Sequence, residues 1–203
     1  QSRFSKYSKI PVSNGMTGAE VAEKMLRDHG IRDVKVVATR GMLTDHYNPQ
    51  TKTVNLSEGV YGSRSVVAAA VAAHECGHAV QFAQGYSPMQ LRSAIIPITN
   101  FGSTISIPLI LIGFLLSAEA LVTVGILLFS TVALFQLVTL PVEFNASRRA
   151  LAVLESRGFL SDEELKGTKR VLSAAAMTYV AALITSLAQL LRLLLVFGGR
   201  RRN

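Results

Sequence analysis

The chain has 203 residues, of which 49% are hydrophobic and only 17% are charged, and its formal net charge is +8. Because globular proteins carry about 25% charged residues, this composition argues against an ordinary soluble domain. The basic residues flank apolar runs and form no patch interleaved with aromatic side chains, so no nucleic acid is expected as a partner. A single cysteine, Cys76, excludes an intrachain disulfide and a thiolate zinc cluster.

The first helix is predicted by the spacing of Thr17 and Glu20, which is that of a capping box. This helix should run to about residue 29, where Gly30 provides a stop. The valine-rich stretch at 34–37 predicts a short strand after it.

A β-hairpin is predicted over residues 43–56, because apolar residues alternate on both sides of the turn at Asn48-Pro49. Ser63 is then expected to cap a long helix, rich in Ala and Val, that covers 64–84. The first half of the chain is therefore expected to combine helices with a small hairpin or sheet.

Three uncharged apolar runs follow, at 93–118, 120–142 and 171–191, and Glu119 alone separates the first two. Each is as long as the roughly 20 residues that a helix needs to cross a bilayer. Buried core helices are the alternative, but three of them would need a larger soluble body to cover them. A separate interfacial helix is expected at 143–155, after Pro141.

Because the long helix contains the motif H-E-x-x-H at His74, Glu75 and His78, the predicted fold class is mainly α with a small β-hairpin or sheet, in which a zincin-like catalytic part is combined with transmembrane helices. The expected parts are the catalytic part with its long helix, a transmembrane hairpin, a helix with a third metal ligand followed by a basic interfacial segment, and a third membrane helix with a basic tail. They cover residues 1–90, 91–142, 143–170 and 171–203.

The long helix carries the motif H-E-x-x-H at His74, Glu75 and His78. Residues four apart share one helical face, so both imidazoles can bind one zinc ion. Glu75 is placed to act as general base on a zinc-activated water molecule. Cys76 points away from the ligand face and is expected to be a packing residue.

A third ligand must be a carboxylate, because no histidine follows His78. The downstream acids are candidates, and two membrane crossings would return the chain to the metal helix at Glu143. Asn145 and Ser147 could support the ligands, since Ser147 lies one turn further along. His46 or Tyr47 of the hairpin could approach the oxyanion. Further oxyanion candidates, left unranked, are Tyr61, Tyr179, Arg148 and Arg149.

The chain resembles the YugP-type neutral zinc metallopeptidases of bacterial membranes. The resemblance is carried by five strings: 43–47 (LTDHY), 73–79 (AHECGHA), 84–86 (QGY), 91–94 (LRSA) and 140–150 (LPVEFNASRRA). It implies a zinc-dependent peptidase in a membrane, with a further span before Gln1. Membrane gluzincins of the HtpX and CaaX-protease type are a more distant match, with E-x-x-x-D where this chain has Glu143 and Ser147.

The resulting hypothesis is a multi-pass protein of the bacterial plasma membrane that binds one Zn²⁺ ion and cleaves peptides or membrane-proximal proteins. The distribution of Lys and Arg favours a cytoplasmic active site, although the basic cluster at 200–202 conflicts with this if the third run crosses. A catalytically silent zinc-binding adaptor is the competing hypothesis, and a transporter is a weaker one. The sequence carries no signal of oligomeric state.

Overall fold

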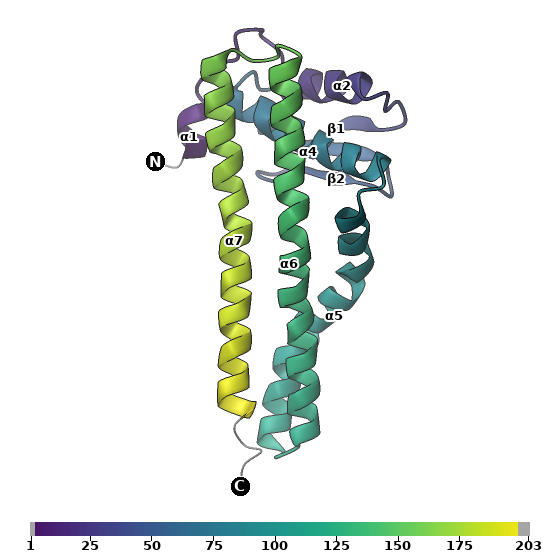
Figure 1. Cartoon of the computed structure of the whole chain (residues 1–203), viewed down its shortest axis with the longest axis vertical. Helices are drawn as coiled ribbons and strands as arrows, with labels where there is room; N and C mark the ends of the chain where they lie inside the picture. Colours follow the sequence, from purple (N-terminus) through teal and green to yellow (C-terminus); the bar gives the residue numbers. More distant parts are fainter. Residues whose placement is uncertain (1–2, 199–203) are drawn as a thin grey trace. The chain divides into compact units, whose positions relative to one another are not determined.

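The protein is described here by a computed structural model that covers residues 3–198 (Figure 1). Over this range it is mainly helical with one small sheet, which confirms the predicted fold class. The elements in chain order are α1 (Arg3–Tyr7), α2 (Gly18–Asp28), β1 (Lys35–Thr39), β2 (His46–Asn48), β3 (Thr53–Ser57), α3 (Glu58–Tyr61), α4 (Val66–Ala83), α5 (Ser87–Leu115), α6 (Glu119–Ser156) and α7 (Asp162–Gly198). The basic cluster at 200–202 lies outside the described residues.

The chain divides into two compact units, and α6 and α7 contribute to both. The first unit contains the chain up to Tyr86 together with Val142–Met177. The second unit contains Ser87–Pro141 and the chain from Thr178 onward.

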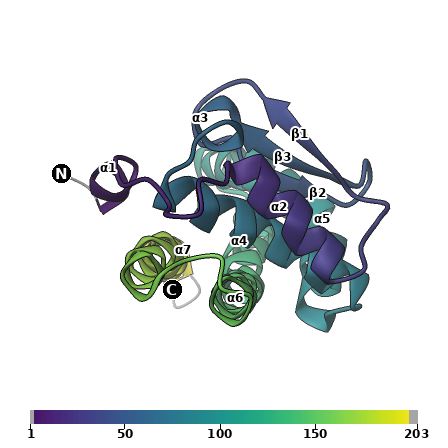
Figure 2. The same ribbon diagram turned by 90° about the horizontal axis from the view of Figure 1, so that it is seen from above.

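The first unit is built around a sheet of order β1-β3-β2 and the helix α4. The central strand β3 is parallel to β1 and antiparallel to β2, so the predicted hairpin is present as β2 and β3. Val54 and Leu56 of β3 are fully buried. The helix α4 packs against β2, β3, α2 and α3, and Figure 2 shows α2 beside the strands. α4 is therefore the core helix of this unit.

The capping box predicted for α2 is confirmed. Thr17 Oγ1 accepts a hydrogen bond from the Glu20 amide at 3.2 Å, and the Thr17 amide donates to Glu20 Oε2 at 2.7 Å. One face of the helix, which includes Val21, Ala22 and Met25, is buried. This pattern is that of an amphipathic helix covering a core.

The second unit consists of long apolar helical segments. Gly102 and Gly125 let α5 and α6 approach closely, because a Cβ atom would lie 2.7 Å from the Leu128 carbonyl oxygen at Gly102 and 2.9 Å from the Ser106 carbonyl oxygen at Gly125. Small residues serve the same purpose between helices in membranes. The helix α5 bends along its length in Figure 1, and Pro97 and Pro108 lie inside it.

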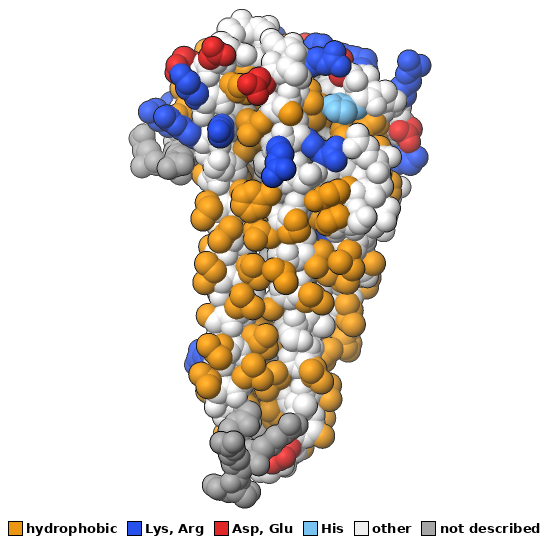
Figure 3. Space-filling view, in the orientation of Figure 1, with side chains coloured by type: hydrophobic (Ala, Val, Ile, Leu, Met, Phe, Trp, Pro, Cys, Tyr) orange, Lys and Arg blue, Asp and Glu red, His pale blue; other side chains and the backbone are white. Residues whose placement is uncertain are grey.

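Many large hydrophobic side chains of the second unit face outward, and Figure 3 shows them covering the visible face of its helices. Examples are Phe101, Leu111, Leu127, Leu137, Ile184 and Leu191. Among the described residues, three helices are long and apolar enough to cross a membrane: α5, α6 and α7. An apolar outer face of this kind suits lipid, because in water it would be a large exposed hydrophobic surface.

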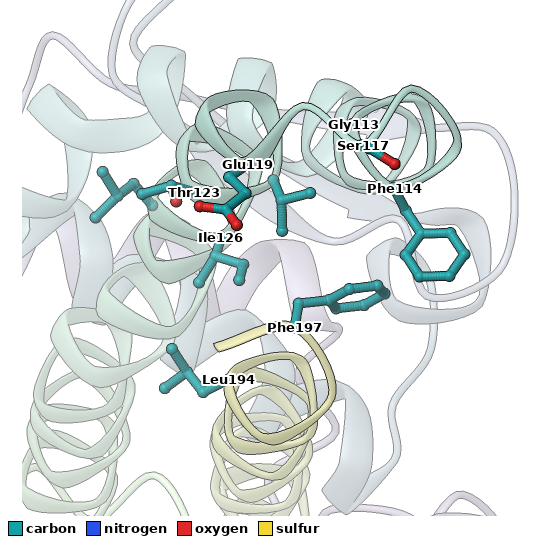
Figure 4. A pocket seen from close by; sticks show the side chains of 10 residues that line it. Gly113, Phe114, Ser117, Glu119, Thr123, Ile126, Leu194 and Phe197 are labelled. Atoms are coloured by element: carbon teal, nitrogen blue, oxygen red, sulfur yellow. The ribbon is translucent and has the colours of Figure 1, made fainter. Parts of the chain in front are cut away.

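The second unit also contains a pocket of about 510 Å³ near the turn between α5 and α6 (Figure 4). Phe114 and Phe197 form part of its wall, with ring centroids 5.7 Å apart. Glu119, one of the acidic candidates for a third ligand, lines this pocket.

The expected helix boundary at Pro141 is wrong, because α6 continues through this residue to Ser156. A proline inside a helix removes one backbone hydrogen bond, and such losses are tolerated where neighbouring groups compensate in an apolar setting. Glu143 therefore lies within a long helix rather than at the start of a new one.

Candidate metal centre

The helix α4 presents the H-E-x-x-H motif on a rigid, buried support. Ser65 is its N-cap and accepts a hydrogen bond from the Ala68 amide at 3.2 Å. The prediction of Ser63 as the cap is wrong, and Ser63 instead donates to the Ser65 hydroxyl at 3.1 Å. Alanine-rich helices are favoured by propensity, and Gly85, with φ of 63°, follows the end of this one.

His74 and His78 project from successive turns of α4, with ring centroids 4.8 Å apart and planes at 87°. Glu143 of α6 meets both rings, since its Oε2 lies 3.2 Å from His74 Nε2 and 3.6 Å from His78 Nε2. These three residues form the one group of His, Cys, Asp or Glu donors within the described chain that could hold a metal ion. The structure thus brings together the three residues predicted as ligands.

The donor set fits zinc in both chemistry and spacing. Two imidazole nitrogens and one carboxylate oxygen form a common set in catalytic zinc sites. Tetrahedral coordination with bonds of about 2.1 Å requires ligand atoms about 3.4 Å apart. The two separations involving Glu143, 3.2 and 3.6 Å, lie on either side of that value.

Burying the Glu143 carboxylate is energetically unfavourable unless a cation lies next to it. Only 2% of this residue is exposed, and a buried carboxylate needs a partner of opposite charge. In the metal-free protein, this carboxylate changes the pKa of His78. Burial alone would lower the pKa of His78, but the contact with Glu143 and the charge of Glu75 outweigh it and raise the pKa above its ordinary value.

Glu75 follows His74 on α4 and is itself buried, with 9% of its surface exposed. Its neighbour Cys76 is fully buried, and the thiol lies 3.5 Å from the Ala22 carbonyl oxygen of α2. Burial, and then the nearby charge of Glu75, raises the pKa of this thiol. Cys76 is thus a packing residue between α4 and α2, as the sequence predicts.

The outer nitrogens of both histidines also have neighbours. Ser147 Oγ lies 3.1 Å from His74 Nδ1, and Gln81 Oε1 lies 3.0 Å from His78 Nδ1. Sequence reasoning named Ser147 but missed Gln81. A polar residue three positions after His78, in an otherwise apolar helix, was the signal that could have identified it.

The other predicted site residues have different surroundings. Asn145 Oδ1 accepts a hydrogen bond from Gln81 Nε2 at 3.0 Å. His46 Nδ1 lies 2.8 Å from the Thr44 carbonyl oxygen. Tyr47 packs against Phe82 with ring centroids 6.0 Å apart, and burial, followed by the charge of Asp33, raises its pKa.

Most of the downstream acids have neighbours outside the cluster. Glu163 pairs with Lys166 at 2.7 Å, while Glu164 accepts from the Ser161 amide at 2.7 Å. Glu155 is exposed on α6. Within the described residues, Glu143 is the acid that joins the two histidines.

A helix with H-E-x-x-H and a buried glutamate from a second helix define a zincin-like arrangement. Comparison with known proteins agrees with this class. The family model described as "putative neutral zinc metallopeptidase" matches residues 1–198. The chain is also 50% identical, over its whole length and 91% of the relative's, to "Putative membrane protease YugP" of Bacillus subtilis (strain 168). No solved structure matches. The chain therefore belongs to this neutral zinc metallopeptidase family.

Proposed function

We propose that the protein is a membrane-embedded, zinc-dependent endopeptidase of the gluzincin type that binds one Zn²⁺ ion. The observation that carries the proposal is the convergence of His74, His78 and Glu143 at a buried point beside Glu75. Family membership and the relative described as a membrane protease support it.

In this proposal His74, His78 and Glu143 hold the ion. A bound zinc ion would supply Lewis-acid chemistry, activating a water molecule and polarising the scissile carbonyl. Glu75 would accept a proton from the water and pass it to the leaving amine.

The substrate is proposed to add to the sheet as an extended strand along β2. This strand is at an edge, since the sheet has the order β1-β3-β2, and it packs on α4. Backbone hydrogen bonds along such an edge bind a peptide in a way that depends little on its side chains. His46 and Tyr47 belong to β2 and would lie next to the bound peptide.

The membrane setting and orientation are part of the proposal. Three helices suited to crossing a bilayer support a multi-pass protein of the bacterial plasma membrane that acts on membrane-proximal proteins or peptides. Lys and Arg gather on the visible face of the first unit in Figure 3. Because cytoplasmic segments are enriched in these residues, a cytoplasmic site is favoured.

The test compares wild type with Glu75→Gln and with Glu155→Gln, an exposed control on α6. Zinc content and cleavage of casein are measured for the detergent-purified proteins. Glu75→Gln should retain zinc and lose cleavage by at least about 100-fold, the usual scale of general-base catalysis. The control should match wild type. Equal cleavage by Glu75→Gln, or a wild type that binds zinc but cleaves nothing, would contradict the proposal, and the second result would favour a zinc-binding adaptor.

A further inference from the structure

The two ring nitrogens of His78 face different neighbours. Nε2 lies 3.6 Å from Glu143 Oε2, on the side of the candidate metal centre. Nδ1 lies 3.0 Å from the side-chain oxygen of Gln81, a residue with no exposed surface. A neutral histidine carries one ring proton, and only the nitrogen without it can bind a cation. The neighbour at Nδ1 therefore bears directly on metal binding at Nε2.

The orientation of the Gln81 amide follows from its other partners. Gln81 Nε2 lies 2.8 Å from the carbonyl oxygen of Val142 and 3.0 Å from Asn145 Oδ1. A backbone carbonyl can only accept, so the NH₂ group must face Val142. The Gln81 oxygen is then left facing His78, where it can only accept.

Arg149 fixes Asn145 in the same way. Its Nε donates to Asn145 Oδ1 at 2.7 Å, and a guanidinium has no acceptor, so the Asn145 oxygen must face it. Arg149 is itself held, because it donates to Gln84 Oε1 at 2.6 Å and its guanidinium lies 6.0 Å from the centre of the Tyr86 ring. A network of hydrogen bonds thus links Arg149 to His78, and the donor of each bond is fixed: Arg149 and Gln81 both donate to Asn145 Oδ1, and the Gln81 oxygen can only accept from His78.

We propose that Gln81 is a positioning residue that holds His78 in the tautomer with its proton on Nδ1, and that Val142, Asn145 and Arg149 lock Gln81 for this purpose. Nε2 is then left unprotonated and free to bind the metal. This inference deepens the proposed zinc-dependent function and rests on it for its biological meaning. The direction of the hydrogen bonds is a property of the protein alone.

His74 provides an internal reference. Its Nδ1 faces the hydroxyl of Ser147 at 3.1 Å, and a hydroxyl can either donate or accept. Gln81 bonds instead to His78, Val142 and Asn145. Changes at Gln81 should therefore alter the ring protons of His78 and leave those of His74 unchanged.

A purely structural role for Gln81 makes a different prediction. If Gln81 only linked α4 to α6, any change that broke its bond to Val142 would weaken the site equally. The variants Gln81→Leu and Gln81→Glu both remove that bond, because neither side chain has an NH₂ group. Only the glutamate retains an acceptor for His78 Nδ1. Comparing the two variants therefore distinguishes a structural role of Gln81 from a positioning role.

The experiment uses zinc-loaded, full-length protein with isotope-labelled histidine, and measures ring-proton exchange by NMR and zinc affinity by competition with a chelator. We expect a protected Nδ1 proton on His78 in wild type and in Gln81→Glu. Gln81→Leu should lose this protection, and its zinc affinity should fall by roughly 10- to 100-fold. Gln81→Glu should retain most of the affinity. Thermal denaturation of both variants measures how far the loss of the bond from Gln81 to Val142, which is common to both, destabilises the protein.

The part of the hydrogen-bond network furthest from His78 is tested with Arg149→Met, and Arg148→Met is the matched control. Arg148 is its neighbour, is exposed, and has the same charge. Because Val142 still orients Gln81, we expect Arg149→Met to cause a smaller loss of zinc affinity, up to about 10-fold, with faster exchange at His78 Nδ1. Arg148→Met should leave both quantities unchanged.

The inference is overturned if Gln81→Leu retains wild-type protection and affinity, or if both Gln81 variants lose affinity equally. These outcomes do not depend on peptide cleavage. A wild type that binds zinc but cleaves nothing would contradict only the proposed function. If zinc did not bind, ring-proton NMR on the metal-free protein would still decide the tautomer, and a neutral His78 ring with its single proton on Nε2 instead of Nδ1 would overturn the inference.

Discussion

Gly77 of α4 packs directly against the main chain of Ala146 in α6, so that a Cβ atom at Gly77 would lie 2.6 Å from the Ala146 carbonyl oxygen. Gly77 precedes His78, and Ala146 lies between Glu143 and Ser147. The two helices therefore approach each other closely at the candidate metal centre. A glycine at this position allows the carboxylate on one helix to reach both imidazoles on the other.

Gly77→Ala should disturb this arrangement. The added methyl group meets backbone atoms, which cannot rotate away, so the helices must separate, at a cost of about 1–3 kcal/mol of unfolding free energy. We expect weaker zinc binding and a lower denaturation midpoint. Gly59→Ala is the control, because a Cβ atom at Gly59 has no neighbour within 4 Å. Wild-type zinc affinity in Gly77→Ala would show that the close contact is dispensable.

Glu143→Gln tests the third ligand. The amide keeps the shape of the side chain but loses the negative charge that makes the site attractive to a divalent cation. Since changes beyond the ligands already cost about 10- to 100-fold in metal affinity, we expect a loss of more than about 100-fold here, measured by chelator competition. The exposed residue on the same helix, Glu155, supplies the control Glu155→Gln. If the two variants bound zinc equally well, another group would have to be the ligand.

Two substitutions at Ser147 test whether its contact with His74 Nδ1 strengthens zinc binding. Ser147→Ala removes the group 3.1 Å from His74 Nδ1, and we expect zinc affinity to fall by about 10-fold. Ser147→Asp puts a carboxylate there and should preserve or increase affinity by strengthening the bond to the ring. Titration of both variants with zinc under the same conditions gives the comparison. The reverse order of affinities would contradict this account of Ser147.

Local spacing was enough to predict part of this structure. The capping box at Thr17 and Glu20 and the shared face of His74 and His78 follow from helix geometry alone. Grouping Glu143 with the histidines needed one further step. Two apolar runs had to be counted as membrane crossings that return the chain to α4, the helix that carries the histidines. The roles of these residues in binding and catalysis remain predictions.

Contacts that depend on tertiary structure could not be predicted. Ser63 and Ser65 could both cap α4, and Ser65 takes this role. The N-terminal segment pairs with the chain at this point: Pro11 forms a β-bridge with Ser65, and the Val66 amide donates to the Ile10 carbonyl oxygen. Gln81 reaches Val142 only because Gly77 lets the two helices meet. No spacing in the sequence encodes such an approach.

The pH dependence of stability should have opposite signs with and without zinc. In the metal-free protein the pKa of His78 is raised above its ordinary 6.5, through the contact with Glu143 and the charge of Glu75. The folded state then binds more protons than the unfolded state just above that value. This stabilisation is complete below the unfolded pKa and is lost as the pH rises through the folded pKa. Zinc must displace the same proton, so its affinity should increase over that window.

Thermal denaturation of chelator-treated and zinc-loaded protein between about pH 6 and pH 8 measures both effects. The midpoint of the metal-free protein should fall as the pH rises, while the increase in midpoint caused by zinc should grow. In Glu143→Gln the fall should be reduced, because the carboxylate that raises the pKa of His78 is gone. A metal-free midpoint that rises with pH would mean that burial, rather than the carboxylate, controls His78 in the folded protein.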